Sequence, residues 1–179
     1  MSKWIAIAAL AAVLGTPAAA RAQKVNIDFD EQAQFGAFKT YSWTTGTPSP
    51  NPLGEARIKA AVEAALAKAG FTQAASSPDV VIATHVIAKE QKEVVTSGYG
   101  GYGPGYRYGY GGGGMTTSQV YTYTQGTLVL DMYDAKSKQL VFRGTGTDTV
   151  SDKADKNEKK VTSALTKMFK QYPPVPKKK

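Results

Sequence analysis

The chain of 179 residues contains no cysteine and only one histidine. Without cysteine it cannot form disulfide bonds, thiolate metal sites or a cysteine nucleophile. With one histidine it cannot hold a metal ion through several imidazole ligands. No apolar run reaches the roughly 20 residues that cross a bilayer as a helix. These absences exclude disulfide scaffolds, thiol enzymes and multi-histidine metal centres, and we expect no metal ion and no cofactor.

The first 22 residues have the pattern of a secretory signal peptide. Lys3 precedes an apolar run of 11 residues, Trp4–Leu14. Ala20 and Ala22 have the small-x-small spacing at which signal peptides are cleaved. We expect cleavage after Ala22 and a periplasmic or exported protein, peripheral to the outer membrane; an uncleaved anchor is the alternative.

Removal of 22 residues from 179 leaves 157, which suits a single domain. Hydrophobic residues make up 42% of the sequence and charged residues 20%, a balance typical of globular proteins. We place the domain at residues 23–172 and a proline- and lysine-rich tail at 173–179. Residues 23–152 have a net charge of −1, whereas residues 153–179 carry nine lysines against two acidic residues, so the positive charge lies at the C-terminal end.

Alternating segments, segments rich in β-forming residues, and a long segment that is apolar on both faces in its first half predict strands. They occupy residues 25–30, 38–43, 80–96, 119–133 and 139–144. Between the second and third of these, apolar residues from Ile58 to Ala69 recur at helical spacing, and Gly70 follows where a left-handed cap is needed.

A last helix is predicted at 153–171, with Asp152 as its N-cap and prolines after it. In the long strands, Gly126 is a candidate β-bulge. The element order favours an α+β fold, in which an antiparallel sheet of about five strands carries two helices on one face.

Residues 98–114 hold ten glycines and five tyrosines. Glycine at this density loses too much entropy on ordering to form regular structure, so we predict a flexible loop at a hairpin tip. Its tyrosine rings could contact sugars or a partner protein, and a spacer without a ligand explains the composition equally well. The candidate interaction residues of this loop are Tyr99, Tyr102, Tyr106, Arg107, Tyr108 and Tyr110.

Two binding classes are rejected for this loop. The segment Gly109–Gly114 matches G-x-G-x-x-G, but it precedes a predicted strand, whereas a dinucleotide site needs the motif between a strand and a helix. Nucleic acid is not an expected partner, because the loop has a single arginine and export would remove such a ligand.

Six sequence blocks together resemble a bacterial family known only as domain of unknown function 4136. They are Val25–Asp30, Phe38–Trp43, Arg57–Phe71, Pro78–Val81, Leu140–Gly144 and Met168–Pro173. The resemblance covers nearly all of the chain after the signal peptide. It implies an envelope protein, often an outer-membrane lipoprotein, with a compact α+β fold and no established biochemical activity. This chain lacks the cysteine on which such a lipid anchor is built.

The titratable residues give no clear catalytic set, and we assign none. His85 lies within a predicted strand with no carboxylate nearby in sequence, so we interpret it as a partly buried structural residue. Asp28 and Asp30 share a strand face and, with Asp131 and Asp134, are the best carboxylates for an acid–base pair or a Ca²⁺ site. A calcium site needs six to eight oxygen ligands, so a solvated strand face is the favoured interpretation.

The last predicted helix places its lysines opposite its apolar residues, and the tail extends them. The lysines of the helix are Lys153, Lys156, Lys159, Lys160, Lys167 and Lys170, and those of the tail are Lys177, Lys178 and Lys179. A helix that packs on a core explains this pattern most simply, but its lysines would still attract anionic lipid or cell-wall polymer weakly and in a salt-sensitive way.

From sequence alone we predict a non-enzymatic interaction or maintenance module of the cell envelope, with envelope proteins, anionic lipid or cell-wall polymer as partners. One alternative is a hydrolase that uses Asp28 or Asp131. Another is an assembly subunit that pairs through the exposed edge of its long hairpin.

Overall fold

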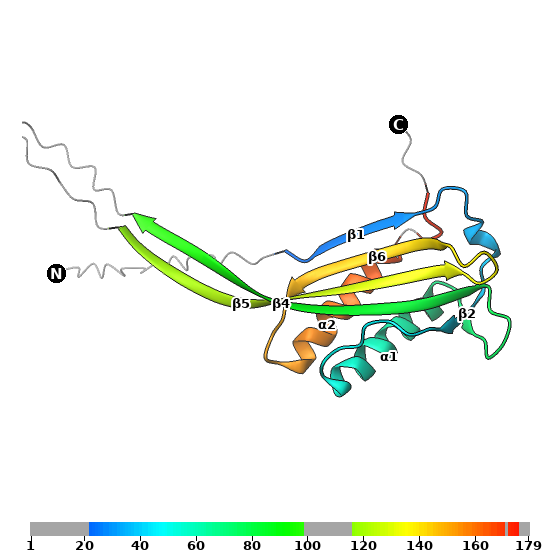
Figure 1. The fold of residues 1–179 in the computed structure, drawn as a ribbon, viewed down its shortest axis with the longest axis horizontal. Helices are drawn as coiled ribbons and strands as arrows, with labels where there is room; N and C mark the ends of the chain where they lie inside the picture. The colour runs from blue at the N-terminus through cyan, green and yellow to red at the C-terminus, as the bar shows by residue number, and fades with distance from the viewer. Residues whose placement is uncertain (1–21, 99–115, 171, 176–179) are drawn as a thin grey trace, which may run out of the picture.

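A computed structural model describes residues 22–98, 116–170 and 172–175 (Figure 1). The described residues form a sheet with two helices on one of its faces, which confirms the predicted α+β class. The elements are β1 (Lys24–Phe29), η1 (Phe35–Ala37), β2 (Thr40–Trp43), α1 (Pro52–Lys68), β3 (Thr72–Gln73), β4 (Val80–Gly98), β5 (Thr116–Asp134), β6 (Leu140–Thr149) and α2 (Ala154–Met168).

The described strands form one mixed sheet in the order β1-β6-β5-β4-β2-β3. Neighbours from β1 to β4 are antiparallel, whereas β2 is parallel to both β4 and β3. The prediction of a purely antiparallel sheet of about five strands was therefore wrong in this detail. The reason is the helix α1, which follows β2 and packs on one face of the sheet. The chain thereby returns to the starting end of β2, so that the next strands run in the same direction as β2.

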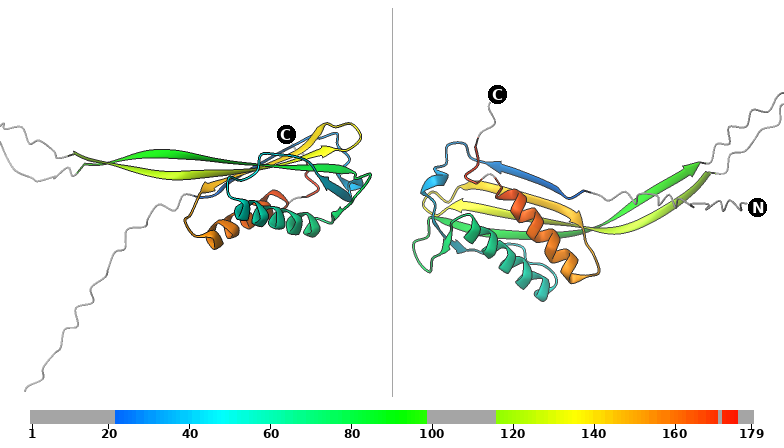
Figure 2. Two further views of the ribbon diagram at one scale, coloured as in Figure 1. Left: turned by 60° about the horizontal axis from the view of Figure 1, so that its bottom comes forward. Right: turned by 180° about the vertical axis from the view of Figure 1, so that it is seen from behind.

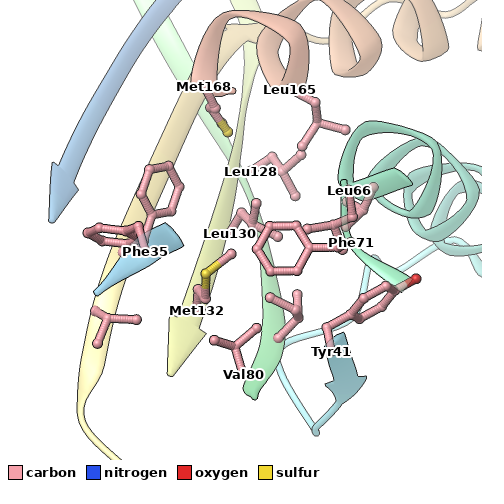
Figure 3. Packing of buried hydrophobic residues seen from close by; sticks show 14 of the residues in the cluster. Phe35, Tyr41, Leu66, Phe71, Val80, Leu128, Leu130, Met132, Leu165 and Met168 are labelled. Atoms are coloured by element: carbon pink, nitrogen blue, oxygen red, sulfur yellow. The ribbon is translucent and has the colours of Figure 1, made fainter. Parts of the chain in front are cut away.

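Both helices lie on the same face of the sheet, side by side (Figure 2). The alternation of the strands supplies the apolar residues beneath them, such as Ile82 of β4 and Leu130 of β5. Leu66 of α1 and Leu165 of α2 meet these residues from above (Figure 3). All four side chains are almost completely buried, so the core lies between the two layers.

The ends of α1 follow from local sequence. Asn51 is the N-cap, and its side chain accepts hydrogen bonds from the backbone of Leu53 and Gly54. At the other end Gly70 has a φ of +90°. The amide of Phe71 donates to the carbonyl of Leu66, which completes the predicted left-handed cap and buries the Phe71 ring.

The predicted N-cap of α2 was wrong. Lys153 holds that position, without a side-chain cap. Asn157 instead holds the segment before the helix, because its side-chain oxygen accepts from the amide of Ser151 and its amide nitrogen donates to the Ser151 carbonyl. The helix ends at Met168, three residues earlier than predicted. The Tyr172 side chain that follows packs against Phe35, Phe71 and Phe142.

The β4–β5 hairpin is longer than predicted, with 19 residues in each strand. The register is continuous from Val80↔Asp134 to Gly98↔Thr116, so Gly126 is not a bulge. Because β6 ends opposite Gln125, the outer parts of the two strands pair only with each other among the described residues. We call this two-stranded part, residues 90–98 and 116–124, the arm; it projects well beyond the body of the domain (Figure 1).

Candidate functional site

A cleft of about 400 Å³ opens on the helix-covered face of the sheet. Ile58 of α1 lines one wall and Val161 and Ala164 of α2 line the other, while Val86 and Leu128 form part of the floor. Both helices begin at the end of the sheet from which the arm projects, and the cleft lies between their N-terminal halves (Figure 2). The volume falls within the range of small-molecule sites, and the walls are mainly apolar.

Small residues of the strands line part of the cleft. Gly126, Gly146 and Ala88 all lie along it. At Gly146 a Cβ atom would come within 2.8 Å of the Cβ of Ala164, so α2 rests directly on the β6 backbone there.

The rim next to α2 is polar and tied by hydrogen bonds. The Lys160 ammonium lies 2.9 Å from the Asp148 carboxylate and donates to the carbonyl of Thr149. Gln23 donates to the backbone carbonyl of Lys160. Arg57, Asp152 and Glu158 also lie on the rim, so its charges are mixed in sign.

A separate polar cluster lies on the sheet face away from the helices. Arg143 donates two hydrogen bonds of 2.6 Å each to the carboxylate of Asp131, which is fully buried. The Tyr133 hydroxyl donates to the same carboxylate, and the His85 Nε2 atom lies 3.6 Å from it. On its other side His85 Nδ1 is 2.9 Å from the Thr47 hydroxyl.

The electrostatics of this cluster are those of a structural network. The hydrogen bonds from Arg143 to Asp131 raise the pKa of the guanidinium, which stays charged. Burial, followed by the charge of Asp131, raises the pKa of the Tyr133 hydroxyl. Arg143 and Tyr133 donate hydrogen bonds to Asp131, whereas His85 Nε2, at 3.6 Å, lies beyond hydrogen-bond distance of that carboxylate.

Sequence reasoning missed the proximity of His85 and Asp131. No carboxylate is close to the histidine in sequence, but the pairing of β4 with β5 sets Asp131 opposite Ala83, two residues from His85 on the same strand face. Alternation along the two strands, combined with a correct register, could have revealed the pair.

Of the other candidate carboxylates, Asp28 on β1 lies directly opposite Arg143 and so borders this cluster, and each of the others makes local backbone contacts. Asp28 accepts from the amide of Phe29, and Asp30 from that of Gln32. Asp134 accepts from two backbone amides in the turn after β5, and these hydrogen bonds lower its pKa. Among the described residues no group of three or more histidine, aspartate or glutamate side chains could hold a metal ion.

Most of the lysines predicted for the last helix are exposed. Lys153, Lys156, Lys159 and Lys170 are exposed. Lys160 differs from the expectation: it is half-buried on the rim of the cleft. Lys167 is exposed and donates to the side chain of Gln23.

Several predicted residues lie outside the described part of the chain. They are the signal-peptide residues up to Arg21, the five tyrosines and Arg107 of the glycine-rich segment, and Lys177, Lys178 and Lys179. Within the described part, no helix combines the length and apolar character that a membrane span requires.

Fold and cleft together define a two-layer α+β protein with an apolar cleft between its helices. The chain belongs to the family described as Domain of unknown function (DUF4136), whose model matches residues 25–174, and this confirms the resemblance found in the sequence. No match was found among curated proteins.

Solved structures with a similar fold share little sequence with the chain. A PDZ domain protein from Parabacteroides distasonis matches with a TM-score of 0.55 at 16% identity, over 87% of this chain and 37% of its own length. The chain thus spans little more than a third of that protein. A PelC dodecamer from Paraburkholderia phytofirmans gives a TM-score of 0.49 at 14% identity, over 83% of this chain and 96% of its own.

Proposed function

We propose that this chain is an exported, non-enzymatic binding module of the bacterial envelope and that the cleft between α1 and α2 is its binding site. The observation that carries the proposal is an apolar cleft of about 400 Å³ in an otherwise closely packed helix layer. The signal-peptide pattern of the first 22 residues supports export.

The lining of the cleft indicates what it would bind. Ile58, Val161 and Leu128 offer apolar surface, which favours an acyl chain or a ring of an amphiphile. The charges on the rim are mixed, and Lys160 already pairs with Asp148. The cleft would therefore select its ligand by apolar shape more than by charge.

A fluorescent apolar probe tests this site. Phenylnaphthylamine should bind and gain fluorescence, and Ile58→Trp should weaken binding about tenfold or more, because the indole would occupy the cleft. Ala60→Trp is the matched control, since Ala60 is exposed on the same helix and does not line the cleft. Equal binding by both variants, or no binding by the unaltered protein, would contradict the proposal.

A second binding mode is favoured by the exposed side of α2. Lys153, Lys156, Lys159 and Lys170 are exposed there, with no ion pair to other described residues. Each lysine near an anionic surface contributes about 1 kcal/mol. Such a face would hold the domain weakly against anionic lipid or cell-wall polymer.

Co-sedimentation with phosphatidylglycerol vesicles tests the basic face. Binding should fall at about 0.5 M salt, where charges are screened over roughly 4 Å. Replacing the four exposed lysines with glutamine should reduce binding, whereas four Lys→Gln changes at Lys24, Lys39, Lys68 and Lys136 should have less effect, because these lysines lie outside α2. Vesicle binding that changes neither with salt nor with either set of Lys→Gln changes would exclude binding through these lysines.

A further inference from the structure

Over a defined stretch, the outer edge of β4 has no strand beside it among the described residues. Along this edge β2 pairs as far as Trp43↔Ile82, and Thr47 then forms a single bridge to His85. The amide of Thr47 donates to the carbonyl of Thr84, and the amide of Val86 donates to the carbonyl of Thr47. Beyond this point no described strand pairs with β4 on this side.

The two hydrogen bonds of Thr47 also establish which backbone groups point outward. Thr84 and Val86 direct their N–H and C=O groups toward the outer edge. Backbone direction alternates along a strand, and the register of β4 is continuous. The outward groups in the following stretch therefore belong to Ala88, Glu90, Lys92 and Val94.

The side chains of this stretch are complementary to themselves when the strand is reversed. Residues 87–95 read Ile-Ala-Lys-Glu-Gln-Lys-Glu-Val-Val. Laid antiparallel to a second copy and centred on Gln91, every lysine faces a glutamate: Lys89 faces Glu93, and Glu90 faces Lys92. At the ends Ile87 faces Val95 and Ala88 faces Val94. Opposite charges and apolar residues in direct cross-strand positions stabilise a sheet.

The backbone geometry agrees with the same register. Ala88 faces Val94 and Glu90 faces Lys92, and all four have their hydrogen-bonding groups on the outer edge. Both partners of each such pair can thus exchange hydrogen bonds, as antiparallel strands require. In a register shifted by one residue, each residue whose backbone N–H and C=O point outward would face one whose groups point inward. The charged side chains would also no longer face opposite charges.

We propose that two copies of this chain pair antiparallel through the outer edges of β4, with the two-fold axis at Gln91. The pairing would extend from Ile87 to Val95, because Thr47 occupies the edge beyond Ile87. It would turn two two-stranded arms into one four-stranded sheet, and a two-stranded hairpin alone is marginally stable in water. Ile87, Val94 and Val95, which are 42%, 61% and 42% exposed, would gain apolar neighbours.

Charge reversal tests this register. Glu90→Lys alone and Lys92→Glu alone each create two like-charge pairs across the axis, so each should raise the dimer dissociation constant about tenfold. The double variant Glu90→Lys/Lys92→Glu restores opposite charges and should dimerise like the unaltered protein. An equimolar mixture of the two single variants should form heterodimers, because all four pairs are then complementary.

Light scattering and sedimentation at micromolar concentrations provide the readout. A monomeric unaltered protein, or single variants that dimerise as well as the double variant, would overturn the proposal. Charged side chains on an edge strand can also act only to prevent aggregation. If that is their role, the unaltered protein and all variants should be monomers, and the mixed single variants should form no heterodimers. This result distinguishes protection against aggregation from dimer formation.

Cross-linking tests the axis independently, because the chain has no other cysteine. In the proposed dimer the two Gln91 residues form a non-hydrogen-bonded pair with Cα atoms about 4.5 Å apart, which suits a disulfide. Gln91→Cys should oxidise rapidly to a covalent dimer. Lys89→Cys is the matched control, since its two copies would lie about 13 Å apart along the strand. Equal oxidation rates for both variants would contradict the axis at Gln91.

Discussion

Arg143 and Asp131 face each other across β6 and β5, and the guanidinium holds both oxygens of a carboxylate that solvent does not reach. The Arg143 side chain itself is 47% exposed. The pair thus joins a buried anion to a half-solvated cation on the sheet face opposite the helices. This arrangement stabilises the sheet.

Removing the arginine should be costly for stability. Arg143→Gln leaves the Asp131 carboxylate buried without its main partner, and we expect a loss of about 3 kcal/mol in the free energy of unfolding. Urea denaturation measures this change. Arg143→Lys retains the charge but has only one donor group. Its free energy of unfolding should therefore lie between those of the unaltered protein and Arg143→Gln. A loss below about 0.5 kcal/mol for Arg143→Gln, the size of an ordinary surface change, would refute this role.

Asp79 should make the fold sensitive to acid. Its carboxylate accepts from the amides of Lys39 and Thr40 and from the Thr40 hydroxyl, and these hydrogen bonds lower its pKa. A carboxyl with a lowered pKa in the folded state stabilises that state fully above its unfolded pKa of about 3.9, and this contribution is lost as pH falls further.

Asp79→Ala should therefore cost about 1–2 kcal/mol at neutral pH, because two backbone amides lose their acceptor. Its free energy of unfolding should also decline less steeply below about pH 4 than that of the unaltered protein. Urea denaturation across this pH range gives both values. Parallel pH curves for the two proteins would show that Asp79 does not contribute to the acid response.

The contact between α2 and β6 depends on a missing side chain. A Cβ atom at Gly146 would lie 2.8 Å from that of Ala164, so Gly146→Ala should displace the helix and cost about 1–3 kcal/mol. Gly144→Ala should also be costly, because its Cβ would lie 2.7 Å from the Sδ and 3.0 Å from the Cγ of the buried Met168 side chain. Gly36→Ala meets nothing within 4 Å and is the control. Thermal unfolding ranks the three, and equal losses would contradict this packing.

The Tyr172 hydroxyl should lower the stability of the fold. Its hydroxyl is buried with no hydrogen-bond partner among the described residues, and burial raises its pKa. Tyr172→Phe keeps the ring contacts with Phe35 and Phe71 and removes the unsatisfied group. The free energy of unfolding should rise by up to about 1 kcal/mol. A clear loss of stability would mean that the hydroxyl is hydrogen-bonded in solution.

Local patterns in the sequence identified most of the elements. Apolar spacing predicted α1, and Gly70 marked its end because a left-handed residue was required there. The first half of the β4 segment, apolar on both faces, predicted a central strand, and β4 lies between β5 and β2. The parallel pairing of β2 was missed because nothing in a single strand records the direction of its neighbour.

The candidate site was harder to predict than the fold. The cleft depends on how two helices pack on the sheet, and Gly126, which sequence reasoning assigned to a bulge, lines it within a regular strand. The approach of His85 to Asp131 depends on register, and the pairing of Lys160 with Asp148 depends on where α2 docks. Each is a long-range relationship that periodicity along one segment does not encode.

The most direct test of the account is the amide NMR spectrum of the protein titrated with phenylnaphthylamine. Binding in the cleft predicts concentration-dependent shifts at Ile58, Leu128 and Val161, with the polar cluster on the far face unchanged. Shifts that centre on His85 and Arg143, with the cleft residues unaffected, would contradict the assignment of this chain as a binding module with its site between α1 and α2.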